Sequence, residues 1–134
     1  QASRLGRFRG TVSEQTERMI RPQECMAHGE TRFAAVTDLY GHGLLAVCTG
    51  QPFSFNATHF SSRQLGETAH DFELSPLAET VVNLDWRQNG VGSNSCGPEL
   101  AAPWRLDART IDFSVRIKPV RIDDCDPFRE IYRK

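Results

Sequence analysis

The sequence predicts an all-β protein that folds as an antiparallel β-sandwich. Several short segments alternate apolar and polar residues with the period of two that is typical of strands with one buried face. Turns rich in glycine, proline and asparagine separate these segments, and no long helical pattern interrupts them. The 134 residues suffice for one domain with a hydrophobic core.

The clearest predicted strand covers residues 110–118. Apolar residues occupy every second position of it: Ile111, Phe113, Val115 and Ile117. Further strands are expected at residues 31–38, 43–50, 53–57, 71–74 and 80–86. The tetrapeptide LYGH, residues 39–42, joins the first two of these, and its length and glycine content predict a hairpin connection.

One short helix is expected near residues 61–66, within the stretch SSRQLGET. Ser61 opens it and Gln64 follows three positions later, which is the spacing of a capping box, while Gly66 limits its length. The polar residues 10–20 could form a helix or an extended segment.

The last residues, 121–134, are charged and predict a surface appendage to a domain formed by residues 1–120. Four apolar side chains in this tail could nevertheless dock on the domain: Ile122, Phe128, Ile131 and Tyr132.

Composition excludes several classes of function. The formal net charge of −1 gives no electrostatic reason to bind nucleic acid or an anionic membrane. The apolar run at residues 44–47 is far too short to span a bilayer. The four cysteines are irregularly spaced, so we expect free thiols, a cytoplasmic location and no zinc site.

The stretch DWRQNGVGSNSCGPE, residues 85–99, contains an unusual glycine-rich loop. A Walker phosphate loop needs a lysine after its last glycine, but Pro98 follows Gly97. A dinucleotide-binding fingerprint would need glycine at Ser95. Cys96 has no sequence signature of a partner base, so a packing thiol is favoured over a nucleophile. The loop is therefore a strand connection or a binding loop.

No other residue is identified as catalytic or as a metal ligand. The four histidines form no HxxxH or HxH array, and each is interpreted as a structural hydrogen-bonding residue. No pair of carboxylates can be assigned to glycoside hydrolysis from spacing alone. Trp86 and Trp104 could stack on a sugar ring, but large aromatic side chains in a sandwich are usually core residues.

Four ordered stretches carry a further signal: RPQECMAHGETRF (21–33), PFSFNATHFSSRQLGETAHDFEL (52–74), ETVVNLDWRQNGVGSNSCGPEL (79–100) and IDFSVRIKPV (111–120). Together they resemble the C-terminal domain of bacterial β-galactosidases of glycoside hydrolase family 2, and the resemblance extends over residues 4–120. Two departures are noted. Cys25-Met26-Ala27 replaces the family's usual Asn-Gly-Asn, and Phe33 stands where tryptophan is usual.

The resemblance implies that this chain is part of a galactose-mutarotase-like supersandwich in a longer polypeptide, cut before Gln1. In the family, two glutamates of a separate TIM barrel perform retaining hydrolysis, with magnesium and sodium ions bound there. This chain alone is therefore expected to be inactive and to hold no cofactor. Its partners would be the upstream domains and a galactoside substrate shared with the barrel, and the full enzyme could be a homo-oligomer.

The resemblance further implies that the 87–98 loop reaches the mouth of the active site. The substrate-proximal residues would be Gly90, Gly92, Asn94, Ser95 and Cys96. Cys96 lies where one branch of the family places a tryptophan that stacks on substrate, so no aromatic stacking is expected from this position.

Three alternatives stay open at the level of sequence. The chain could be an independent carbohydrate-binding module. It could be a mutarotase-like epimerase that uses His28 and His70 as acid and base. It could also be a purely structural domain.

Overall fold

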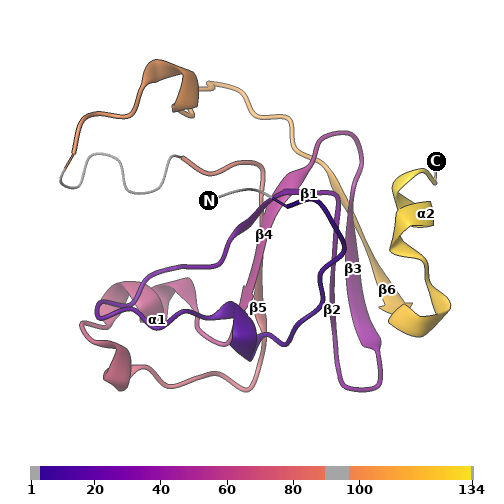
Figure 1. The fold of residues 1–134 in the computed structure, drawn as a ribbon, viewed down its shortest axis with the longest axis horizontal. Coiled ribbons are helices and arrows are strands. Elements are labelled where there is room, and N and C mark those ends of the chain that lie inside the picture. The colour runs from indigo at the N-terminus through magenta and orange to yellow at the C-terminus, as the bar shows by residue number, and fades with distance from the viewer. Residues whose placement is uncertain (1–3, 90–96, 134) are drawn as a thin grey trace. The chain divides into compact units, whose positions relative to one another are not determined.

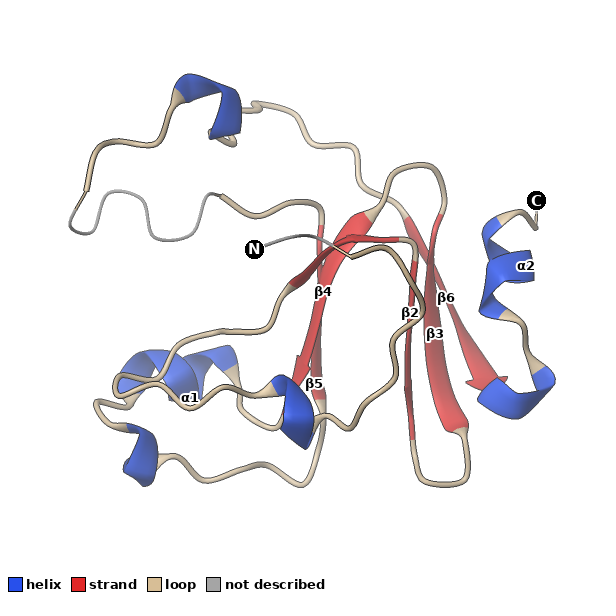
Figure 2. Ribbon diagram, in the orientation of Figure 1, coloured by secondary structure: helices blue, strands red, loops and turns tan. Residues whose placement is uncertain are grey.

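The computed structural model of the chain describes residues 4–89 and 97–133, and over these residues the fold is all-β. The strands are β1 (His28–Thr31), β2 (Phe33–Thr37), β3 (His42–Cys48), β4 (Phe53–Thr58), β5 (Val81–Asp85) and β6 (Val115–Arg121). They form two three-stranded sheets with the orders β1-β4-β5 and β2-β3-β6 (Figures 1 and 2). The pairs β1–β4, β2–β3 and β3–β6 are antiparallel, which confirms the predicted class.

The chain divides into two compact units. The first unit consists of residues 1–27 and 56–82, and the second unit of residues 28–55 and 83–134. The first unit contains the helix α1 (Ser62–Glu67), and the second unit contains the sheet β2-β3-β6 and the helix α2 (Pro127–Ile131).

The hairpin β2–β3 forms where LYGH predicts it. Phe33 pairs with Val47 and Thr37 with Gly43, so the two strands are in continuous register. Asp38 fixes the turn, because its Oδ1 accepts hydrogen bonds from the backbone N–H groups of Tyr40 and His42. Gly41 has φ +83°, a left-handed conformation that glycine adopts without steric cost.

The core of the second unit brings together side chains from both sheets. Ala34, Ala46, Cys48 and Phe53 are buried, and four partly buried residues pack against them: Phe55, Leu84, Val115 and Ile131. Phe53 and Leu84 come from one sheet, whereas Ala34 and Ala46 come from the other. This arrangement is sandwich-like, and each fully buried large side chain stabilises it by about 1.5–3 kcal/mol.

The predicted helix is confirmed as α1. Ser61 has an extended backbone, and its Oγ accepts a hydrogen bond from the Gln64 N–H at 3.1 Å, as a helix N-cap does. Leu65 is the residue that α1 buries. The helix ends at Glu67, one residue after Gly66, whose low helical propensity disfavours further helix.

Two strand predictions were wrong in whole or in part. Residues 71–74 form a 3₁₀ turn at Asp71–Glu73, because the Glu73 carboxylate accepts the His70 N–H at 2.8 Å and so stabilises a local turn. The predicted strand 110–118 starts only at Val115. Ile111 and Phe113 are 56% and 39% exposed, since β3 ends at Cys48 opposite Val115 and offers no partner further back.

One strand was not predicted. In β1, residues 28–31 carry no apolar alternation, and the pairing with β4 is irregular between His28 and Thr31. Glu30 has φ +54° inside this irregularity. The undecided segment 10–20 contains a 3₁₀ turn at Ser13–Gln15.

The C-terminal tail packs on the second unit through α2. This helix contacts β2 and β3, and the Phe128 ring meets the Phe33 ring edge to face at 5.6 Å. Ile131 packs against the core cluster, whereas Tyr132 remains 74% exposed. Two of the four apolar tail residues, Phe128 and Ile131, therefore pack on the second unit.

Candidate functional site

The loop residues that the sequence singles out lie outside the described residues. These are Gly90, Gly92, Asn94, Ser95 and Cys96. The structure does describe the start of this connection. The Arg87 guanidinium lies 5.1 Å above the Trp86 ring, and the Asn89 Oδ1 accepts a hydrogen bond from the Leu106 N–H at 3.0 Å.

A cavity of about 410 Å³ lies within the first unit. Residues from three parts of the sequence line it, in the ranges 13–25, 56–60 and 65–76. Glu24 comes from the PQE motif and His59 from the ATH motif, so two of the stretches that carry the family resemblance meet at this cavity. The cavity is therefore the first candidate site among the described residues.

His59 is held in a defined orientation beside the cavity. It follows β4 directly, and its Nδ1 lies 3.1 Å from the Glu79 carbonyl oxygen. A carbonyl can only accept, so Nδ1 is the donor and carries the proton. In the neutral imidazole, the lone pair is then on Nε2, which remains as an acceptor for a ligand.

Glu24 and Arg18 supply charge to the same cavity. The Glu24 Oε1 accepts a hydrogen bond from the Ser62 Oγ at 2.7 Å. The Arg18 Nε lies 2.9 Å from the Asp71 Oδ2, so these two cavity residues form an ion pair. Both polar pairs connect the segment 13–25 with the segment 61–76 beside the cavity.

Apolar side chains form much of the remaining lining. They are Met19, Pro22, Phe60, Leu65, Leu74 and Pro76. Asn56 also lines the cavity and is only 4% exposed. A mostly apolar hollow with a few convergent polar groups is the usual composition of a small-molecule site.

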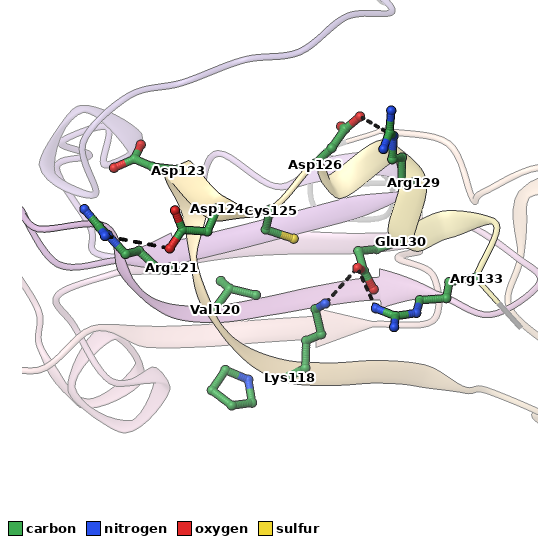
Figure 3. A pocket seen from close by; sticks show the side chains of 11 residues that line it. Lys118, Val120, Arg121, Asp123, Asp124, Cys125, Asp126, Arg129, Glu130 and Arg133 are labelled. Atoms are coloured by element: carbon green, nitrogen blue, oxygen red, sulfur yellow. Dashed lines mark hydrogen bonds and ion pairs between the residues drawn. The ribbon is translucent and has the colours of Figure 1, made fainter.

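A second hollow of about 660 Å³ lies in the second unit, between the end of β6 and α2 (Figure 3). Its charged residues compensate one another: Arg121 pairs with Asp124 at 3.7 Å, and Arg129 pairs with Asp126 at 3.9 Å. Since these opposite charges are already paired with residues three positions away, this hollow is better explained as the seam between the tail and the sheet.

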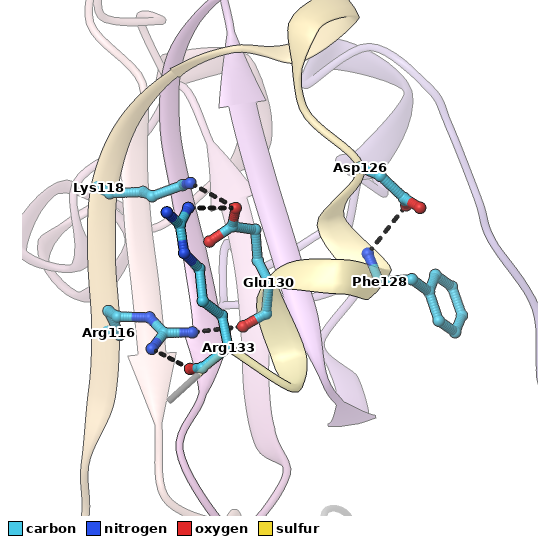
Figure 4. A network of polar contacts seen from close by, with 6 residues as sticks. All are labelled: Arg116, Lys118, Asp126, Phe128, Glu130 and Arg133. Atoms are coloured by element: carbon cyan, nitrogen blue, oxygen red, sulfur yellow. Dashed lines mark hydrogen bonds and ion pairs between the residues drawn. The ribbon is translucent and has the colours of Figure 1, made fainter.

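The same seam contains a polar network around Glu130 (Figure 4). The Lys118 Nζ lies 2.8 Å and the Arg133 Nη1 3.3 Å from the Glu130 Oε1. Arg116 donates to the backbone carbonyls of Glu130 and Arg133, which caps the C-terminal end of α2. The hydrogen bond from Lys118 and the charges of Lys118 and Arg133 lower the pKa of the Glu130 carboxyl.

The other sequence-predicted candidates lie elsewhere. His28 stacks on Phe55 at 6.0 Å, and His70 stacks on Phe72 at 5.3 Å, and neither lines the cavity of the first unit. Trp104 is 71% exposed and is therefore not a core residue. The sequence reasoning missed His59 and Glu24 as site residues, although their position inside the PQE and ATH motifs was the available signal.

Three further observations concern the described part of the chain. Cys25, Cys48 and Cys125 are free thiols. Within residues 4–89 and 97–133, no group of three or more His, Cys, Asp or Glu side chains is placed to hold a metal ion. None of the helices in this part is both long and apolar enough to cross a membrane.

Comparison with known proteins identifies the family. The family described as "Beta galactosidase small chain" matches residues 1–117. The "Beta-galactosidase" of Staphylococcus xylosus is 44% identical over 117 residues, which are 87% of this chain and 12% of that protein. The "Beta-galactosidase" of Actinobacillus pleuropneumoniae is 32% identical over 102 residues, 76% of this chain and 10% of that protein.

The "Beta-galactosidase" of Priestia megaterium is 31% identical over 93 residues, 69% of this chain and 9% of that protein. This chain thus spans about a tenth of the length of the curated relatives that it matches. The matched region contains both motifs that line the cavity of the first unit, and it ends inside β6, before the tail. The chain belongs to the beta galactosidase small chain family.

Proposed function

We propose that this chain is a segment of a β-galactosidase that hydrolyses terminal β-D-galactosides with retention of configuration. The observation that carries the proposal is the family match over residues 1–117, together with 44% identity to a protein named "Beta-galactosidase" over 87% of the chain. Retaining hydrolysis needs two carboxyl groups on opposite sides of the glycosidic bond, one as nucleophile and one as acid and base.

The catalytic carboxylates of this proposal belong to a TIM barrel outside the 134 residues, as the family resemblance implies. The magnesium and sodium ions would also be held there, with the enzyme acting in the cytoplasm. The role of this segment is then to buttress the barrel and to place the 87–98 loop at the mouth of the active site.

A comparison of the isolated chain with the longer polypeptide tests the catalytic part of the proposal. The longer polypeptide is expected to cleave a chromogenic β-galactoside, with β-galactose as the first product seen by NMR. The isolated chain is expected to release no chromophore. Turnover by the isolated chain that scales with its concentration and disappears on denaturation would contradict the assignment of catalysis to the rest of the polypeptide.

A second experiment separates a loop that touches substrate from one that only connects strands. In the longer polypeptide, Asn94→Ala and Cys96→Ala are expected to change kcat or KM if the loop contributes to substrate binding. A matched control is Ser75→Ala, an exposed residue of the first unit. Unchanged kcat and KM in both loop variants would support the purely structural alternative.

A further inference from the structure

The cavity of the first unit has the features of a ligand site, and hydrolysis in a separate barrel does not use it. We propose that this cavity binds one neutral sugar ring of the pyranose class. Its volume of about 410 Å³ lies near the lower end of the range for small-molecule sites, roughly 300–1,000 Å³. That volume suits a single ring better than an oligosaccharide.

The cavity offers two hydrogen-bond acceptors, one from His59 and one from Glu24. His59 is held by its Nδ1–H bond to the Glu79 carbonyl at 3.1 Å, which leaves Nε2 as the acceptor. Glu24 is held through Oε1 by the Ser62 hydroxyl, and its second oxygen accepts no hydrogen bond from any described residue. Both acceptors are positioned by partners that lie outside the cavity lining.

The cavity also offers donors. The Arg18 guanidinium uses its Nε–H for Asp71 at 2.9 Å, and a guanidinium carries four further N–H donors on its Nη atoms. A ligand that satisfies both kinds of group must donate and accept at neighbouring positions. Sugar hydroxyls do both, because each has one O–H donor and two lone pairs.

The charge and polarity of the lining argue against other ligand classes. Glu17, Glu24 and Asp71 outnumber Arg18, so an anionic ligand such as a phosphate ester would be repelled. A purely apolar ligand would offer no donor to the second Glu24 carboxylate oxygen or to the His59 Nε2. Phe60 and Leu74 supply apolar contact for the C–H face of a sugar ring.

The test measures binding and not turnover, so its outcome is independent of the proposed hydrolytic function. The 134-residue chain is titrated with D-galactose and with D-glucose by calorimetry and by saturation-transfer NMR, with glycerol as an acyclic reference. Saturable binding with a Kd of about 1 mM is expected for at least one of the two pyranoses. No saturable binding is expected for glycerol.

Two variants then assign the binding to the cavity. Glu24→Gln keeps an oxygen for Ser62 and turns the other carboxylate oxygen into an amide donor, which reverses the polarity offered to the ligand. His59→Asn keeps an N–H near the Glu79 carbonyl and removes the Nε2 acceptor. Each variant is expected to weaken pyranose binding about tenfold, the loss of one well-placed hydrogen bond.

Glu67→Gln is the matched control. It makes the same charge change in the same unit, at an exposed residue paired with Arg63 that does not line the cavity. This variant should bind like the unmodified chain, and far-UV circular dichroism confirms that each variant keeps its fold. Absence of saturable binding to either pyranose, or binding that both cavity variants leave unchanged, overturns the proposal.

Discussion

The Lys118 Nζ lies 2.8 Å from the Glu130 Oε1, and this ion pair joins β6 to α2 (Figure 4). Lys118 is the residue directly after the family-matched region, which ends at residue 117. The Glu130 side chain is only 12% exposed, and Arg133 approaches the same oxygen. The tail thus brings its own partly buried charge to the sheet, and that charge is compensated by two cations.

Glu130 makes the free energy of unfolding of the chain vary with pH in the acid range. Its pKa is lowered in the folded state, chiefly by the hydrogen bond from Lys118. The folded state therefore holds this proton more weakly than the unfolded state, whose glutamate pKa is about 4.3. The stabilisation is complete above the unfolded pKa and is lost as the pH falls through the folded pKa.

Urea unfolding of the chain and of Glu130→Gln checks this pH dependence. At pH 7 the variant is expected to be the less stable of the two, and the difference should shrink as the pH is lowered below the unfolded pKa. Glu67→Gln, at an exposed surface pair, should show little effect at any pH. A stability difference for Glu130→Gln that stays constant between pH 7 and acid pH would show that the effect is not electrostatic.

The contact between Phe128 and Phe33 predicts a packing contribution from the tail. Phe128→Ala is expected to lower the free energy of unfolding by about 1–2 kcal/mol, less than for a fully buried ring because the side chain is partly exposed. Tyr132→Ala, at an exposed ring in the same tail, should change it by less than about 0.5 kcal/mol. A loss for Phe128→Ala as small as that for Tyr132→Ala would mean that α2 contributes little packing.

Local chemistry explains which parts of the fold could be predicted from the sequence. The hairpin at residues 38–42 and the start of α1 depend on residues within four positions of one another, so Gly41 and Ser61 were sufficient signals. The start of β6 at Val115 depends on where β3 ends, at Cys48, which is 67 positions earlier. The apolar alternation that begins at Ile111 carries no information about that distant strand end. The strand predicted at 71–74 failed because a side-chain cap competed with extended pairing.

The candidate cavity could not be predicted from spacing, because its lining comes from three separate segments. Glu24 and Ser62 are 38 positions apart, and Arg18 and Asp71 are further apart still. The family motifs marked Glu24 and His59 as related positions but did not show that they face one cavity. The glycine-rich loop remains a prediction from the resemblance, since residues 90–96 lie outside the described part of the chain.

The Ser61 side chain caps the N-terminus of α1, and its contribution to stability can be measured. Ser61→Ala removes the hydroxyl that accepts the Gln64 N–H and should lower the free energy of unfolding by about 1 kcal/mol. Ser75→Ala is the control, because Ser75 contributes only its backbone carbonyl to Gln64, at 2.7 Å, and the substitution keeps that bond. Thermal or urea unfolding of both variants distinguishes them, and equal stabilities would contradict the assigned cap.

Gly43 is the glycine of β3 for which a side chain has no room. A Cβ at this position would collide with the Val36 carbonyl oxygen and would lie 2.7 Å from the Thr37 Cα, and both obstacles are backbone atoms of the paired strand. Glycine inside a strand often marks such a close approach of two backbones. Gly43→Ala must therefore push β2 and β3 apart at the end of the hairpin.

The expected result for Gly43→Ala is a loss of more than about 2 kcal/mol in the free energy of unfolding. Gly50→Ala is the matched control, because a Cβ at Gly50 meets nothing within 4 Å. By reducing the freedom of the unfolded chain, Gly50→Ala should leave stability unchanged or raise it slightly. If the Gly43→Ala variant were as stable as the Gly50→Ala variant, that result would contradict the close approach of β2 to β3 at Val36.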